Sequence, residues 1–97
     1  MANQADKTFF ARADAHIKLS NEQISKEVSR GKVSASMLYA AARFNAWVSA
    51  TGYLSRTEMA KGREETLDYF CEQYRKMLEE NLDDYIENYE KYMGTIQ

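Results

Sequence analysis

Residues 34–51 read SASMLYAAARFNAWVSAT, and this stretch decides the fold class. It contains no acidic residue, and Arg43 and Asn45 are its only strongly polar side chains. The whole chain contains no proline, which indicates uninterrupted helix. The stretch therefore predicts a helix over about 35–51 that is apolar on nearly every side, and such a helix needs covering on more than one side.

The segment before it carries apolar side chains at three-to-four-residue intervals, which predicts an amphipathic helix over about 8–28. These side chains are Phe10, Ala13, Ile17, Ile24 and Val28. We expect Gly31 to end this helix, because glycine adopts the left-handed helix cap without a Cβ penalty. Ser34 or Ser36 is then expected to cap the start of the second helix, and Gly52 follows its end.

The last segment predicts the longest helix, over about 56–93. Ser55 and Glu58 have the spacing of a capping box, and Gly94 follows the last apolar side chain. One stripe of this helix carries Met59, Leu67, Cys71, Tyr74, Leu78, Tyr85, Tyr89 and Tyr92. A second possibility is a turn with a fourth helix capped by Asn81 and Asp84, but the absence of Gly and Pro there favours a continuous helix.

Short connections make sequential helices antiparallel, so residues 1–97 predict one all-α domain, an antiparallel three-helix bundle with a long C-terminal helix. At about 1.5 Å per residue the third helix would extend for about 57 Å, against about 32 Å and 26 Å for the other two. Its end would overhang and leave a row of apolar side chains uncovered: Leu78, Leu82, Tyr85, Ile86, Tyr89 and Tyr92, with Met93 beside them. Burying each of these side chains stabilises the folded protein by about 1.5–3 kcal/mol. We therefore expect a homo-oligomer, with a dimer favoured, that buries this row.

Composition excludes several classes of protein. The chain has 13 Lys+Arg against 15 Asp+Glu, 44% hydrophobic and 29% charged residues, which is typical of a folded domain and not of a membrane-embedded chain. One cysteine and a polar N-terminal stretch favour a cytoplasmic location. Charge is divided unevenly: residues 1–57 carry eight Lys/Arg and four Asp/Glu (+4), and residues 58–97 carry five and eleven (−6).

The sequence predicts no metal, cofactor or nucleic-acid site. His16 is the only histidine and has no Cys or His at ligand spacing, while the acidic side chains of 79–90 lack the Glu-x-x-His pairs of di-metal bundles. Cys71 is expected to be a buried, small apolar side chain. The helix over 35–51 is too poor in basic and polar side chains to be a DNA recognition helix.

Arg43 and Asn45 are the residues singled out for chemistry. A guanidinium in apolar surroundings is destabilising unless it is paired, so we expect Arg43 to meet a carboxylate at the edge of the core. The candidate partners are Asp14, Asp68 and Glu72. The alternative is a ligand site in which Arg43 and Asn45, with His16, hold an anionic small molecule.

Two phrases carry a resemblance to known proteins: VSASMLYAAARFNA at 33–46 and YFCEQYRKMLEENLDDY at 69–85. They resemble a family of small bacterial proteins of unknown function, and the likeness extends over about residues 8–92. The resemblance implies an all-helical bacterial protein and supplies no activity. From the residues we expect a non-enzymatic, cytoplasmic helical homo-oligomer that acts through protein–protein contact, with a small-molecule-binding regulator as the alternative.

Overall fold

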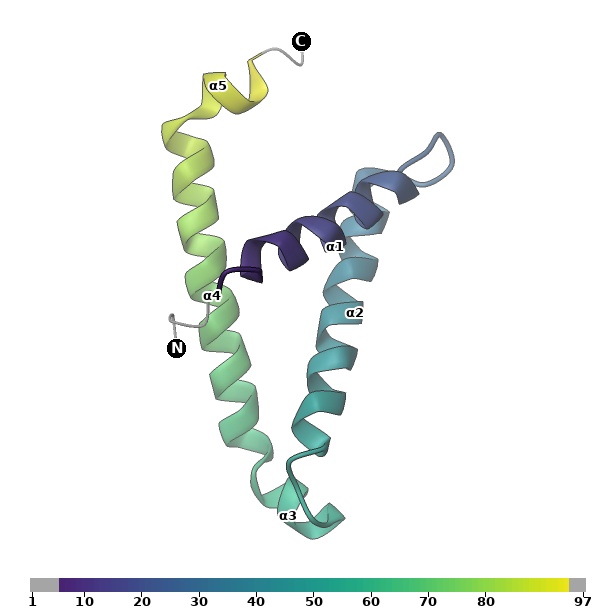
Figure 1. The fold of residues 1–97 in the computed structure, drawn as a ribbon, viewed down its shortest axis with the longest axis vertical. Helices are drawn as coiled ribbons and strands as arrows, with labels where there is room; N and C mark the ends of the chain where they lie inside the picture. Colours follow the sequence, from purple (N-terminus) through teal and green to yellow (C-terminus); the bar gives the residue numbers. More distant parts are fainter. Residues whose placement is uncertain (1–5, 95–97) are drawn as a thin grey trace. The chain divides into compact units, whose positions relative to one another are not determined.

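A computed structural model describes residues 6–94. The described chain is all-helical and contains no strand, which confirms the predicted all-α class. Its helices are α1 (Phe9–Gln23), α2 (Arg30–Ala50), α3 (Arg56–Lys61), α4 (Arg63–Glu87) and α5 (Tyr89–Met93), coloured from purple to yellow in Figure 1. They form two compact units, one up to Val48 and the other from Ser49, and each unit is described separately below.

In the first unit α1 ends earlier than the sequence predicts. It stops at Gln23, and Ile24 has extended backbone angles. The Ser25 hydroxyl then accepts hydrogen bonds from the backbone N–H of Glu27 and of Val28, and the Ser25 N–H donates to the Val28 carbonyl. A serine that bonds to its neighbouring backbone in this way offers an alternative to helix. The predicted end near Val28 was therefore wrong.

The start of α2 is set by Ser29, not by the residues that the sequence indicated. The Ser29 side-chain oxygen accepts from the Lys32 N–H at 3.2 Å, which is the N-cap geometry. Gly31 consequently lies in the first turn of α2 and has no positive φ, so the prediction that it ends a helix was wrong. The predicted caps were wrong too: Ser34 and Ser36 lie inside α2, where the Ser36 hydroxyl donates to the Val33 carbonyl.

In the second unit the predicted helix over 56–93 is broken twice. Its start is confirmed: Ser55 caps α3 and accepts from the Glu58 N–H at 3.1 Å. Gly62 separates α3 from α4, and the Tyr53 ring lies against it, since a Cβ at Gly62 would be 2.9 Å from the ring carbon that bears the hydroxyl. The Tyr53 hydroxyl is 3.3 Å from the Thr66 hydroxyl. Glycine therefore permits a close approach that turns the chain between the two helices.

The second break is at Asn88. The Asn88 amide donates to the Asp84 carboxylate at 2.9 Å, and the Tyr92 hydroxyl donates to the other oxygen of that carboxylate at 2.9 Å. The Tyr85 and Tyr92 rings pack with centroids 4.6 Å apart. These contacts hold α5 at an angle to α4, and Figure 1 shows it turned from the α4 axis.

No helix begins near Asn81, so the alternative of a fourth helix capped by Asn81 and Asp84 is wrong. Asn81 lies within α4, where its amide donates to the Met77 carbonyl at 2.7 Å. The two breaks also shorten the long helix. With 25 residues, α4 extends for about 37 Å against about 32 Å for the 21 residues of α2, so the two helices differ less in length than the sequence predicts.

Little of the described chain is buried. Val33 in α2, at 5% exposure, is the one buried apolar side chain in residues 6–94, while large apolar side chains on α1, α2 and α4 remain exposed. The exposed apolar side chains include Phe10, Ile17, Leu38, Phe44, Trp47, Leu67, Leu82 and Tyr85. Neither unit by itself has the core that a folded domain requires.

We expect Ser55→Ala to lower the free energy of unfolding by about 1 kcal/mol, because the substitution leaves the Glu58 N–H without its side-chain acceptor. Urea denaturation at a fixed protein concentration measures the change. Ser34→Ala is the control, since it places a better helix former at an exposed position inside α2. A Ser55→Ala variant as stable as the native protein would show that the Ser55 cap contributes nothing.

We expect Asp84→Asn to return the pKa of the Tyr92 hydroxyl toward its ordinary value of 10.0. In the native protein that pKa is raised, chiefly because the neutral hydroxyl donates to the Asp84 carboxylate. A raised folded-state pKa means that this contribution to stability is present below the unfolded pKa and is lost as pH rises through the folded pKa. Titration of ring-¹³C tyrosine by NMR measures it. Asp83→Asn is the control, and an unchanged Tyr92 pKa in Asp84→Asn would contradict the assignment.

Candidate functional site

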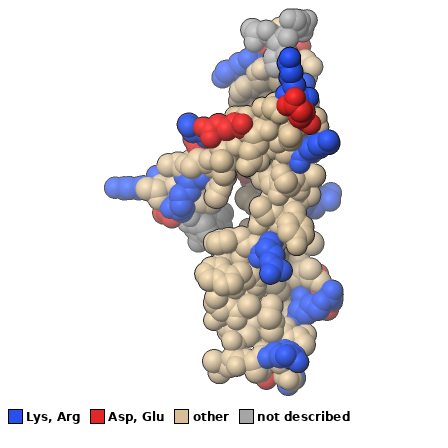
Figure 2. Space-filling model, turned by 90° about the vertical axis from the view of Figure 1, so that its right-hand side faces the viewer, with Lys and Arg blue, Asp and Glu red and all other residues tan. Residues whose placement is uncertain are grey.

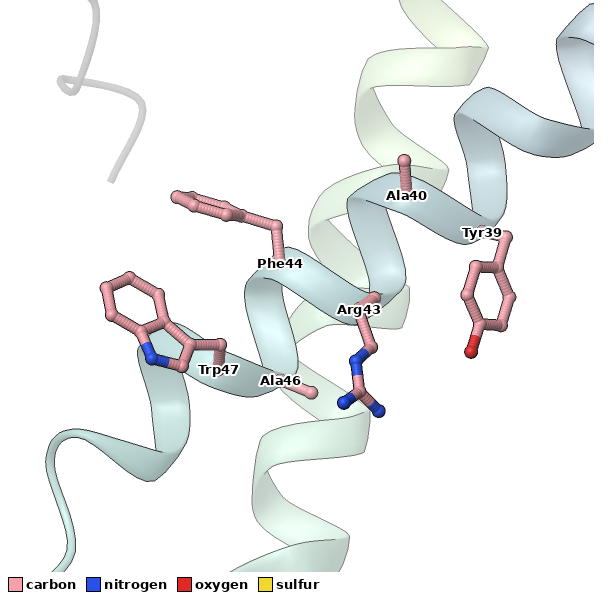
Figure 3. Close-up of a pocket in the computed structure, with 6 residues that line it drawn as sticks. All are labelled: Tyr39, Ala40, Arg43, Phe44, Ala46 and Trp47. Carbon is pink, nitrogen blue, oxygen red and sulfur yellow. The ribbon is translucent and has the colours of Figure 1, made fainter.

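A shallow depression lies on the surface of α2 and is built from one helix alone. It is lined by Tyr39, Ala40, Arg43, Phe44, Ala46 and Trp47, which we call the α2 face (Figure 3). Figure 3 shows the Tyr39 ring and the Arg43 guanidinium on one side of the helix, with the Phe44 and Trp47 rings directed to the other. The small Ala40 and Ala46 side chains leave the space between them. An exposed concave surface on one helix suits a binding partner better than an enclosed small molecule.

The aromatic side chains of the α2 face are not covered within the first unit. Phe44 and Trp47 are each 61% exposed, and their ring centroids are 5.6 Å apart. They lie three residues apart and so occupy neighbouring positions on the helix surface. A contiguous patch of exposed aromatic side chains is typical of an interaction surface, whereas single scattered exposed side chains are not.

Arg43 is exposed, not enclosed at the edge of a core as the sequence suggested. Within the described part of its own unit it forms no ion pair, so Asp14, one of the three candidate partners, does not pair with it. The apolar side chains around Arg43 are themselves exposed, which removes the need for a buried partner. Pairing with Asp68 or Glu72 stays a prediction; within its own helix Glu72 lies 3.6 Å from Lys76.

The predicted polar cluster of Arg43, Asn45 and His16 does not form one site. Arg43 and Asn45 are two residues apart, about 200° around the helix, and so leave α2 in nearly opposite directions. Asn45 is half-buried, whereas His16 is exposed on α1, and neither lines the depression. The geometry gives Arg43 aromatic neighbours instead of polar ones.

The second candidate surface is the row of apolar side chains predicted as an interface. We call it the aromatic row; it comprises Leu78, Leu82, Tyr85 and Ile86 of α4 with Tyr89 and Tyr92 of α5. All six are exposed, from 37% for Tyr92 to 73% for Ile86. Leu78, Leu82 and Tyr85 share one face of α4 by their spacing. Because the helix breaks at Asn88, Tyr92 joins the row by packing on Tyr85 instead of continuing the stripe.

The charged side chains on the face drawn in Figure 2 do not gather into one patch. Figure 2 shows them dispersed, with broad uncharged surface between them. Several form exposed pairs along a single helix, such as Lys18 with Glu22 and Arg75 with Glu79, which stabilise helices by about 0.3–0.5 kcal/mol each.

Cys71 is exposed, which corrects the prediction that it is buried, because the apolar face of α4 that carries it is not covered within the second unit. In residues 6–94 no group of three or more His, Cys, Asp or Glu side chains is arranged to hold a metal ion. None of the described helices combines the length and the apolar character that crossing a membrane requires.

Comparison with known proteins places the chain in a family. Residues 9–86 match a family described as "Protein of unknown function (DUF3144)". A solved structure, "NMR structure of the protein NB7890A from Shewanella sp", is similar with 39% identity and a TM-score of 0.78, over 96% of this chain and 98% of that one. No curated protein matches. The expected resemblance to a helical family of unknown function is thus confirmed, and the chain belongs to the DUF3144 family.

Proposed function

We propose that this protein is a helical homo-oligomer, a dimer in the first instance, that acts through protein–protein contact and performs no catalysis. The observation that carries the proposal is the burial of Val33 alone among the described apolar side chains. Ordering a chain of this length costs far more conformational free energy than one buried side chain offsets. A second copy supplies the missing apolar contacts.

The three long helices α1, α2 and α4 are the elements that a bundle of this kind would contain. Each carries exposed large apolar side chains, and α2 carries them around most of its circumference. A helix that is apolar on nearly all sides belongs in the interior of an assembly. The sole cysteine forms no internal disulfide and agrees with a cytoplasmic setting for that assembly.

The surfaces described above also favour contact over catalysis. An active site has convergent polar groups in a concave pocket. The α2 face instead offers one guanidinium among aromatic and alanine side chains, and Asn45 is directed away from it. Amphipathic aromatic side chains and arginine are the types enriched at protein interfaces.

Sedimentation equilibrium of the native protein tests the proposal. We expect a mass near twice the 11.2 kDa of the chain, and a melting temperature that rises with protein concentration. A mass of one chain at every concentration, with a melting temperature independent of concentration, would refute the homo-oligomer.

A further inference from the structure

We propose that the α2 face of one copy receives the aromatic row of a second copy, so that a two-fold symmetric dimer contains this contact twice. The inference rests on the proposed homo-oligomer and adds to it which surfaces meet. The occupant of the α2 face is thus a second copy of this chain, through the α4–α5 segment.

Charge complementarity is the first support. No acidic residue occurs from Val28 to Thr57, and α2 contains Arg30, Lys32 and Arg43, of which Arg43 lies on the α2 face. Residues 58–97 carry eleven Asp/Glu against five Lys/Arg. A basic apolar surface and an acidic apolar surface attract each other and disfavour the wrong pairing.

The ion pairs within each helix leave the charges needed for this contact available. Arg43 forms no ion pair among the described residues of its unit, while Arg75 and Lys76 take Glu79 and Glu72 within α4. Asp83 follows Leu82 directly and so borders the aromatic row; among the described residues of its own unit it has no cationic partner. Arg43 against Asp83 would place a cation beside a carboxylate at the rim of an apolar contact.

The shapes of the two surfaces agree as well. The small Ala40 and Ala46 side chains line the depression together with the bulky side chains of the α2 face. Leu78, Leu82 and Tyr85 form a ridge at three-to-four-residue spacing on α4, and a ridge of this kind packs into a groove on a facing helix. Tyr85 would bring an aromatic ring to the guanidinium of Arg43, which favours the cation.

A dimer that pairs the two aromatic rows, or the two α2 faces, has more charge repulsion than the reciprocal arrangement. Two aromatic rows face to face would bring together two acidic segments, since residues 78–92 carry six Asp/Glu against one Lys, and two α2 faces would oppose their Arg43 side chains. The reciprocal arrangement avoids both repulsions, and a two-fold axis makes the two contacts identical.

Isotope-filtered NMR on an equal mixture of ¹³C,¹⁵N-labelled and unlabelled native protein tests the contact. Trp47 is the only tryptophan, so its indole signals identify the α2 face without ambiguity. We expect intermolecular NOEs between the Trp47 indole and the methyl groups of Leu78 or Leu82. Intermolecular NOEs between the aromatic rows of two copies would overturn the inference. NOEs between Trp47 and the aromatic row of the same chain only would overturn it as well. So would the absence of any NOE between Trp47 and the row.

A charge reversal supplies the second readout. Arg43→Glu should raise the dimer dissociation constant at least tenfold, whereas Lys26→Glu makes the same change of charge outside the α2 face and should leave it within twofold. Equal effects of the two variants would overturn the inference. A dimeric mass with either negative result leaves the homo-oligomer standing, whereas a monomeric native protein refutes both.

Discussion

The double variant Tyr85→Glu, Tyr89→Glu is expected to be monomeric at concentrations where the native protein is dimeric. Both side chains are exposed in the single chain and lie in the aromatic row. Aromatic side chains at the centre of an interface contribute about 2 kcal/mol or more each, so losing two raises the dissociation constant roughly a thousandfold for each of the two equivalent contacts in the dimer. The two added carboxylates also increase the repulsion within an already acidic segment. Sedimentation velocity and thermal unfolding measure the loss.

A matched control separates interface loss from added charge. Tyr69→Glu with Gln73→Glu adds the same two charges to α4, on the side of the helix away from the row. This control should keep the native mass. An unchanged mass and melting temperature in the Tyr85, Tyr89 variant would show that the aromatic row forms no interface. Tyr85 also packs on Tyr92, so Tyr89→Glu alone, which keeps that ring pair, should weaken the dimer in the same direction.

The helices were readable from the sequence, but several of their ends were not. The cap at Ser55 was recognisable because Glu58 follows it at the right spacing. At the start of α2, the serines at 29, 34 and 36 each have a side-chain oxygen that could cap a helix. Because Gly31 was expected to end the preceding helix, the cap was predicted after it and not before it. Ser29 caps the helix, and Gly31, without a positive φ, is simply a residue of its first turn.

Gly62 itself indicated a possible break in the helix, but the helical periodicity of the apolar side chains continues across it. Met59 and Leu67 continue the periodicity across it, yet a glycine inside a helix is unfavourable by about 1 kcal/mol relative to alanine. What the sequence does not contain is the reason for the break, namely the ring of Tyr53 against the glycine. The bend at Asn88 is of the same kind, since it depends on Asp84 binding two side chains at once.

Of the two candidate surfaces, the aromatic row could be predicted from the sequence and the α2 face could not. The aromatic row follows from helical spacing, so its members were identifiable and are exposed. The association of Arg43 with Asn45 failed because polarity was considered without the 100° advance per residue. The same advance identifies what was missed, namely that Tyr39, Phe44 and Trp47 lie around Arg43 on one depression. An all-round apolar helix indicates that such a surface exists and does not indicate which side is the more concave.

Gly62→Ala is expected to destabilise the protein by about 1–3 kcal/mol, the range for forcing an extra methyl group into a packed site. The new Cβ would meet the Tyr53 ring at 2.9 Å and 3.1 Å, so the whole ring has to move and its contact with the Thr66 hydroxyl is lost. Alanine also reduces the entropy of the unfolded chain, which favours folding by about 0.4–1 kcal/mol. The collision involves ring carbons as well as the hydroxyl, and we therefore expect the steric effect to prevail. Thermal and urea unfolding at one protein concentration measure the sum.

Gly31→Ala is the matched control, because the same substitution there should have the opposite sign. The nearest atom to a Cβ at Gly31 is the Ser29 hydroxyl oxygen at 3.9 Å, and the residue lies in the first turn of α2 without a positive φ. Alanine should stabilise that position by about 0.5–1 kcal/mol. A double-mutant cycle between Gly62→Ala and Tyr53→Ala then isolates the collision: removing the ring should abolish most of the cost of the added methyl group. If Gly62→Ala stabilises the protein as Gly31→Ala does, or if its cost persists without the Tyr53 ring, the close approach of Tyr53 is not what requires glycine between α3 and α4.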